Sequence, residues 1–95
     1  MAAYVIGEIE VTDPATYDEY RRQVLPTVQK YGGRFLARGG RAQALEGAAA
    51  AKRVVVLEFP SYERALEWYR SGDYAPLAAL RQKASQGRLL LVESA

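Results

Sequence analysis

The sequence contains no cysteine and no histidine. Without cysteine there is neither a disulfide framework nor a thiolate zinc site, and a reducing cytoplasm is the expected location. Without histidine, the chain has no Ser-His-Asp or Cys-His catalytic arrangement, and no haem, zinc or non-haem iron held by histidine. A divalent ion held by carboxylates alone is the one metal site left open, and we expect neither a metal nor a cofactor.

Three other features are missing. No apolar run approaches the roughly 20 residues that cross a bilayer, and Met1 leads into a strand-like segment rather than a secretory signal. No glycine-rich loop precedes Lys-Ser or Lys-Thr, so nucleotide binding is not expected. Thirteen Lys and Arg against eleven Asp and Glu give a net charge of +2, with arginines interleaved among acids. We therefore expect no membrane and no nucleic acid as a partner.

What is present is typical of one small domain, because the 95 residues are 49% hydrophobic and 25% charged. We expect residues 1–95 to form that single domain. β-branched and aromatic residues predict a first strand over 4–11. A helix should follow, capped at Thr12-Asp13-Pro14 and ended by Gly32-Gly33. Pro26 within it predicts a kink or a loosened turn near Arg22, whose carbonyl would lose its partner. Apolar residues at spacings of three and four give this helix one buried stripe: Tyr17, Tyr20, Val24, Val28 and Tyr31.

The second half predicts two strands, a broken helix and a last strand. The strands cover 34–38 and 53–59, with Gly39-Gly40 marking a bulge or a close backbone approach. Between them, the alanines at 48–51 are interpreted as a surface insertion, with a helical turn as the alternative. After Pro60-Ser61 a helix runs from 62 to about 71, and Asp73 or Ser71 caps a further stretch to 84. Gln86-Gly87 should end that stretch, before a strand over 88–93.

This order, β-α-β-β-α-β, predicts an α+β fold of the ferredoxin-like type with an antiparallel or mixed four-stranded sheet in the order 4-1-3-2. The first and third strands are expected to be central and parallel. Helices cover one face of such a sheet, yet both faces carry apolar residues, because Tyr4, Ile6, Val54 and Val56 alternate with inward-pointing neighbours. Two copies packed face to face would bury the uncovered side, so we expect a homodimer.

The same alternation suggests a polar site. Glu8, Glu10 and Glu58 should gather at one sheet edge if the first and third strands are parallel, with Arg34 and Arg38 as the nearest counter-charges. One interpretation is a structural network of ion pairs. The other is a pocket in which Arg38, or the more distant Arg81, holds an anionic group while Glu58 accepts or returns a proton.

Aromatic side chains narrow the location of a substrate. Aromatic side chains at helical spacing either pack in the core or, where tyrosine hydroxyls lie beside an arginine, bind a small planar carboxylate or an oxygenated aromatic compound. They are Tyr17, Tyr20, Trp68, Tyr69 and Tyr74.

Several motifs occur together along the chain: Tyr17 and Tyr20, Gly32-Gly33-Arg34-Phe35, Arg38-Gly39-Gly40, Leu45-Glu46-Gly47, Glu58-Phe59-Pro60-Ser61, and Trp68-Tyr69 with Ser71, Tyr74 and Arg81. As a set they resemble the domain-of-unknown-function 1330 family of the dimeric α+β-barrel superfamily. The resemblance implies a ferredoxin-like protomer and a dimer, without a settled activity. Enzymes elsewhere in the superfamily include small monooxygenases and isomerases, several of which rely on histidine or a cofactor. Position 31, where some relatives are expected to carry histidine, is Tyr31 here.

The resulting hypothesis is a small cytoplasmic homodimeric protein that binds a small anionic or aromatic molecule in a cleft beside the sheet. As a cofactor-independent enzyme it would use Glu58 as proton acceptor and Arg38 to stabilise an oxyanion. The alternative is a non-catalytic interaction or assembly module, which would have no ligand pocket.

Overall fold

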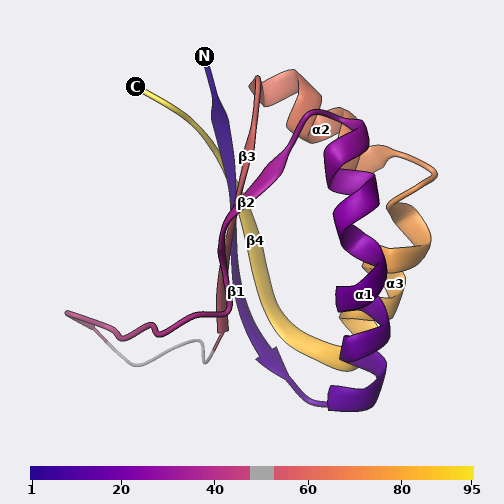
Figure 1. Cartoon of the computed structure of the whole chain (residues 1–95). Coiled ribbons are helices and arrows are strands. Elements are labelled where there is room, and N and C mark those ends of the chain that lie inside the picture. Colours follow the sequence, from indigo (N-terminus) through magenta and orange to yellow (C-terminus); the bar gives the residue numbers. More distant parts are fainter. Residues whose placement is uncertain (48–52) are drawn as a thin grey trace.

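The computed structural model describes residues 1–47 and 53–95, so the expectation for the alanines at 48–51 lies outside the described residues. The elements follow the predicted order: β1 (Ala3–Val11), α1 (Pro14–Lys30), β2 (Arg34–Arg38), β3 (Arg53–Phe59), α2 (Tyr62–Arg70), α3 (Ala75–Ala84) and β4 (Ser85–Glu93). The three helices lie on one side of the four-stranded sheet, and no described helix covers the other side (Figure 1). None of these helices is long and apolar enough to cross a membrane.

The sheet has the order β2-β3-β1-β4, which confirms the predicted 4-1-3-2 arrangement read from the other edge. All three neighbouring pairs are antiparallel, so the expectation of parallel central strands is wrong. The reason is topological. The crossover through α1 returns β2 in the direction of β1, and β3 then pairs with β2 as the next antiparallel strand, so it runs against β1 as well.

Helix α1 begins and ends as the sequence predicts. The Asp13 carboxylate accepts a bond from the backbone N–H of Thr16 at 3.3 Å, and Gly32, with a φ of +80°, leads the chain out of the helix. The helix is continuous through Pro26, so the proline neither ends nor splits it. Pro26 has no N–H to offer to the carbonyl of Arg22. The neighbouring carbonyl, that of Arg21, accepts a hydrogen bond from the Arg38 guanidinium.

Serine hydroxyls bond to the backbone at both ends of α2, whereas α3 has Tyr74 as its N-cap residue and no side-chain cap bond, so the predicted cap of this helix at Asp73 or Ser71 is not formed. Ser61 Oγ accepts from the backbone N–H of Arg64, and Ser71 Oγ accepts from that of Tyr74, both at 3.1 Å. The last strand differs from the prediction, because β4 starts at Ser85, directly after α3. Gly87 does not end the helix: it lies within β4 at a φ of +146°, where an added Cβ would come within 2.0 Å of the Glu8 carbonyl oxygen. Glycine there permits the close pairing of β4 with β1.

Strand β2 also departs from its prediction. Its bulge lies between Phe35 and Ala37 rather than at Gly39. Gly39 instead has a φ of +76° and lies against the guanidinium of Arg53. A side chain at position 39 would collide with that guanidinium. The close approach expected at the paired glycines is thus made by a side chain.

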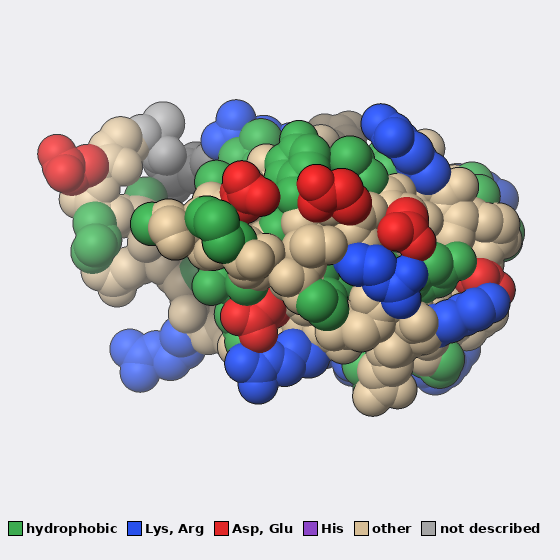
Figure 2. Space-filling model, turned by 90° about the horizontal axis from the view of Figure 1, so that it is seen from above, with side chains coloured by type: hydrophobic (Ala, Val, Ile, Leu, Met, Phe, Trp, Pro, Cys, Tyr) green, Lys and Arg blue, Asp and Glu red, His purple; other side chains and the backbone are tan. Residues whose placement is uncertain are grey.

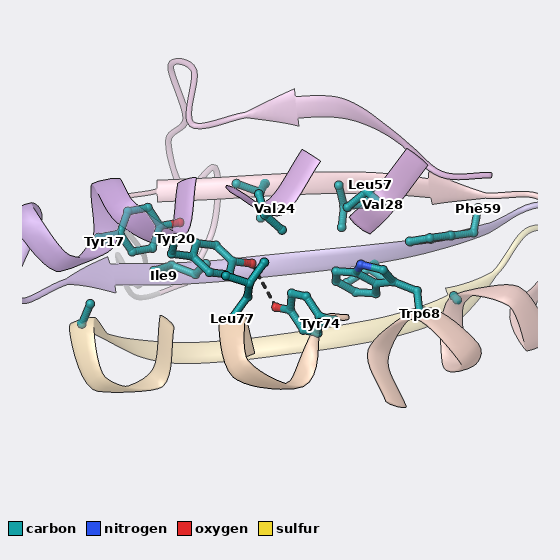
Figure 3. Packing of buried hydrophobic residues seen from close by; sticks show 14 residues of the cluster. Ile9, Tyr17, Tyr20, Val24, Val28, Leu57, Phe59, Trp68, Tyr74 and Leu77 are labelled. Atoms are coloured by element: carbon teal, nitrogen blue, oxygen red, sulfur yellow. Dashed lines mark hydrogen bonds between the residues drawn. The ribbon is translucent and has the colours of Figure 1, made fainter. Parts of the chain in front are cut away.

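The core lies between the helices and the inner face of the sheet, and aromatic rings fill its middle (Figure 3). The Trp68 ring lies between Phe59 and Tyr74, with centroid distances of 5.2 and 4.1 Å. The remaining fully or nearly fully buried hydrophobic residues include Val5, Ile9, Val24, Val28, Val55, Leu57 and Leu77. The predicted stripe of α1 is confirmed, except that Tyr31 is half-buried.

The register defines the uncovered face of the sheet, which we call the open face. Its middle row is apolar, because Ile6 pairs with Val56 on one side and with Leu90 on the other. An ion pair lies on either side of this row: Arg34 with Glu58 at 2.8 Å, and Arg88 with Glu8 at 2.7 Å. Leu90 is 44% exposed in the single chain. The open face therefore has an apolar centre and a charged rim.

Seen from the end that carries both termini, acidic and basic side chains are scattered among apolar ones (Figure 2). Among the described residues, no large region of one charge sign covers this view.

Candidate functional site

The structure does not bring the predicted catalytic pair together. Glu58 pairs with Tyr4 on the open face, where Arg34 Nε donates to its carboxylate. Arg38 pairs with Val55, a buried residue on the helix side, and its guanidinium lies 4.2 Å from the centroid of the Phe35 ring. The bulge in β2 explains the difference, because one extra residue reverses the alternation and sends Arg34 and Arg38 to opposite faces.

The predicted cluster of carboxylates is also dispersed. Because β1 and β3 are antiparallel, Glu58 lies opposite Tyr4 whereas Glu8 lies opposite Val54. The two positions are four residues apart along β1, or roughly 13 Å at about 3.3 Å per residue. The structural interpretation, in which Arg34 neutralises Glu58, is the one that the geometry supports.

A pocket of about 410 Å³ lies elsewhere, between α2, α3 and the edge strand β4. Three of the predicted substrate-binding residues line it: Trp68, Tyr69 and Arg81. We call it the Arg81 pocket. The rest of its lining was not predicted, and consists of Val5, Ala65, Leu66, Gln82, Gly87, Arg88, Leu89, Leu90 and Leu91. The predicted strand order is the sequence signal that could have found these residues. It places the last strand at the edge of the sheet, where the broken second helix crosses it.

Arg81 is the unusual residue of this pocket. It is only 6% exposed, and its Nε donates to the Tyr74 hydroxyl at 3.4 Å. No ion pair between Arg81 and a carboxylate is found within residues 1–47 and 53–95. No fully buried side-chain nitrogen or oxygen in these ranges lacks a partner, so the two terminal nitrogens of Arg81, which bond to no described residue, keep some exposure to solvent.

The protonation state of Arg81 follows from its surroundings. Burial favours the neutral form, but the hydroxyls of Tyr74, Tyr20 and Tyr69 outweigh burial, and the pKa of Arg81 is raised above its ordinary value. The side chain is therefore a cation at any physiological pH. A cation with one long hydrogen bond and no carboxylate partner is poised to receive an anion.

Tyr74 and Tyr20 extend this arrangement into the core. Their hydroxyl oxygens are 2.9 Å apart, shown by the dashed line in Figure 3. Burial, and the neighbouring Tyr74, raise the pKa of Tyr20 far above its ordinary value, so this hydroxyl stays protonated. Both tyrosines were predicted to bind substrate. The structure places them behind Arg81 instead, where they position its guanidinium.

The aromatic rings take different roles at the pocket wall. The indole N–H of Trp68 donates to Thr27 Oγ1 at 3.1 Å, so the ring offers only carbon surface to the pocket. Tyr69 is 42% exposed and lies at the mouth. An apolar wall beside a guanidinium suits a small anion with a flat carbon body.

Tyr17, the remaining predicted residue, lies apart from the Arg81 pocket. With Tyr20, Arg21, Arg38 and Arg53 it lines a second cavity of about 20 Å³, between α1 and the sheet. A space of that size holds about one water molecule. As for metals, no group of three or more Asp or Glu side chains suited to a metal ion occurs in the described part of the chain.

Comparisons with known proteins agree on the fold. The sequence matches the family model described as "Domain of unknown function (DUF1330)" over residues 2–95. No curated protein matches it.

Solved structures from several organisms share the fold at low identity. RPA0582 from Rhodopseudomonas palustris, a protein of unknown function, superimposes with a TM-score of 0.79 at 19% identity, over 99% of this chain and 82% of that one. SnoaB from Streptomyces nogalater, a cofactor-independent oxygenase, gives a TM-score of 0.71 at 10% identity, over 99% and 93%. HapK from Hahella chejuensis gives 0.61 at 16%, over 98% and 92%. At such identities the similarity establishes the fold alone.

Proposed function

This chain belongs to the DUF1330 family, and from its geometry we propose that it is a cytoplasmic homodimer that binds a small organic anion with a flat apolar body in the Arg81 pocket. The observation that carries the proposal is the buried guanidinium of Arg81, which has a tyrosine hydroxyl but no carboxylate as its partner among the described residues. The cytoplasmic location rests on the absence of cysteine.

The energetics favour an anionic ligand. Placing a cation where water is largely excluded has a high free-energy cost, and a charge-assisted hydrogen bond to a bound carboxylate offsets it. The volume of about 410 Å³ lies within the range of small-molecule pockets. Trp68 and the leucines of β4 supply apolar surface for the rest of the ligand. This pocket also favours a binding function over an interaction module without one.

A cofactor-independent oxygenase is the second candidate, since that is the activity in the name of SnoaB. The Arg81 guanidinium supports it, because a buried cation stabilises the oxyanion of an ionised aromatic substrate. No carboxylate occurs among the described residues that line the pocket, so Glu58 is not placed to remove a proton there. This candidate therefore requires a substrate that ionises unaided, and oxygen consumption with such a compound tests it.

The homodimer is proposed from the open face. Its apolar middle row and charged rim have the anatomy of an interface. The molecule measures 32 × 31 × 17 Å, so its broad face is large enough for the roughly 800 Å² that a stable dimer buries on each partner. Residues 41–47 extend away from the sheet on this uncovered side (Figure 1), and Leu45 among them is 86% exposed. A second copy would cover both features.

The binding proposal is tested by thermal denaturation with benzoate and salicylate as probes. A probe present at 100 times its dissociation constant adds about 2.7 kcal/mol of stability, which is a measurable rise in Tm. Arg81→Met should abolish the rise. Arg70→Met, at an exposed position of α2, is the matched control and should retain it.

Two outcomes would contradict this proposal. One is a wild-type protein that neither probe stabilises at millimolar concentration, which would favour the interaction module. The other is an Arg81→Met variant with an unchanged rise. If Arg81→Met does not fold, Arg81→Lys keeps the charge but loses the fork of donors, and it should bind both probes more weakly than the wild type.

A further inference from the structure

Three guanidinium groups converge at a second place, the corner where α1 meets β2 and β3. Arg21, Arg38 and Arg53 all line the small cavity described above. Arg38 donates to the backbone carbonyl of Arg21, and Arg53 Nε donates to the Tyr17 hydroxyl at 3.2 Å. We call this group the arginine corner. It shares no arginine with the Arg81 pocket, although Val5, Trp68 and Leu89 line both cavities.

The positive charge of this corner is only partly neutralised. Arg21 has an ion pair with Asp18 at 3.3 Å. Neither Arg38 nor Arg53 has one with any carboxylate in the described ranges. Partial burial and the charges of Arg21 and Arg53 hold the pKa of Arg38 below its ordinary value, which reflects how closely the cations are gathered.

The guanidinium groups are held in place by groups that leave their charge uncompensated. Arg38 lies over the Phe35 ring, and Arg53 lies 5.3 Å from the centroid of the Tyr17 ring. Arg53 also packs against Gly39, where a side chain would collide with it. Because the Tyr17 hydroxyl accepts the bond from Arg53, its own proton remains free to be donated.

We propose that the arginine corner is a second anion site, which binds a doubly charged oxyanion of the phosphate class. Forked guanidinium groups match the oxygens of a phosphate, and two unpaired cations match its charge better than that of a monocarboxylate. The enclosed cavity of about 20 Å³ is too small for a phosphate. The anion therefore binds at the outer mouth, where Arg38 is exposed and Arg53 is half-buried. This site is independent of the function proposed for the Arg81 pocket.

The experiment is a calorimetric titration with inorganic phosphate and, separately, with phenyl phosphate, at constant ionic strength. Wild-type protein should bind both saturably. Each of Arg38→Met and Arg53→Met should weaken binding at least tenfold, since a hydrogen bond to a charged group is worth about 1.5 kcal/mol or more and 1.4 kcal/mol is a factor of ten. Because phenyl phosphate is also a flat organic anion of the kind proposed for the Arg81 pocket, the two probes are compared in the Arg81→Met protein, where the tighter one shows whether free phosphate or a phosphorylated small molecule is the better ligand.

Two controls make the result specific. Arg34→Met removes another β2 arginine, one that pairs with Glu58 on the open face, and should leave phosphate binding unchanged. Arg81→Met should also leave it unchanged. Absence of saturable binding to wild-type protein, or equal weakening by Arg34→Met and Arg38→Met, overturns the proposal. Should Arg53→Met fail to fold, the exposed Arg38 decides the test alone.

Discussion

Replacing Val56 by lysine should dissociate the proposed dimer without unfolding the protomer. Val56 lies in the apolar middle row of the open face, between Ala37 and Ile6. It is half-buried in the single chain, so a lysine there can extend its ammonium into water when no partner is present. In a face-to-face dimer the partner's sheet covers this position, so the ammonium cannot extend into water. A two-fold axis also places every substitution in the interface twice.

The size of the effect follows from this position. Losing roughly 40 Å² of buried apolar surface at about 25 cal/mol per Å² costs about 1 kcal/mol for each copy. An ammonium left without a partner in the apolar row costs about 1–3 kcal/mol more. With two copies in one interface, the dimer loses at least about 4 kcal/mol, so its dissociation constant should rise roughly a thousandfold.

Sedimentation velocity at low micromolar concentration measures this change. Wild-type protein should sediment as a dimer and Val56→Lys as a monomer with an unchanged far-ultraviolet circular dichroism spectrum. Gln29→Lys, at an exposed position of α1, adds the same charge on the helix side and should remain dimeric. A Val56→Lys protein with the wild-type sedimentation coefficient would refute the assignment of the interface, and a monomeric wild type would refute the dimer itself.

Three further predictions concern the protomer. Gly33→Ala should lower the free energy of unfolding by about 1–3 kcal/mol, because the added Cβ would lie 2.6 Å from the Phe59 ring. Gly72→Ala, with open space around it, should change this free energy little, and chemical denaturation measures both. Tyr74→Phe removes the hydroxyl that receives the bond from the pocket guanidinium, so it should reduce the rise in Tm that benzoate causes and cost about 1 kcal/mol of stability. Hydrogen bonds from the first turn of α1 hold the pKa of Asp13 below its ordinary value of 3.8, so the ionised carboxylate stabilises the fold at neutral pH. The difference in Tm between the wild type and Asp13→Ala should therefore narrow as the pH falls below 3.8, and a constant difference would contradict this.

Local signals in the sequence specify most of the fold. The bounds of β2 and β3 agree with the alternating apolar residues between glycine and proline, and the caps at Asp13 and Ser61 agree with their side-chain oxygens. These features depend on residues near one another in the chain. The prediction that Gly87 ends a helix is wrong because glycine is required there by the close approach of a neighbouring strand, which the local sequence does not reveal.

The structure brings together neither the predicted carboxylate cluster nor the pair of Glu58 with Arg38, for two non-local reasons. The direction of β3 relative to β1 separates Glu58 from Glu8, and the bulge in β2 separates Arg34 from Arg38. Either one changes which side chains share a face, although the bounds of β2 and β3 agree with the prediction. Arg81, a residue that the sequence analysis names, lines the pocket, but the sequence did not show that it would be buried beside a tyrosine hydroxyl rather than a carboxylate.

The Arg81 pocket and the open face meet at the edge strand β4, so ligand binding and dimerisation should be coupled. Leu89 and Leu91 line the pocket from the helix side, whereas Leu90 lines it from the row that pairs with Ile6 on the open face. A partner that covers this row would also restrict the pocket mouth and exclude water from it. The monomeric Val56→Lys protein should therefore bind benzoate more weakly than the wild type, while Arg81→Met should remain a dimer that binds none. Equal benzoate affinity in the monomer and the dimer would show that the partner does not reach the pocket. Coupling is reciprocal, so bound benzoate would then not strengthen the dimer either.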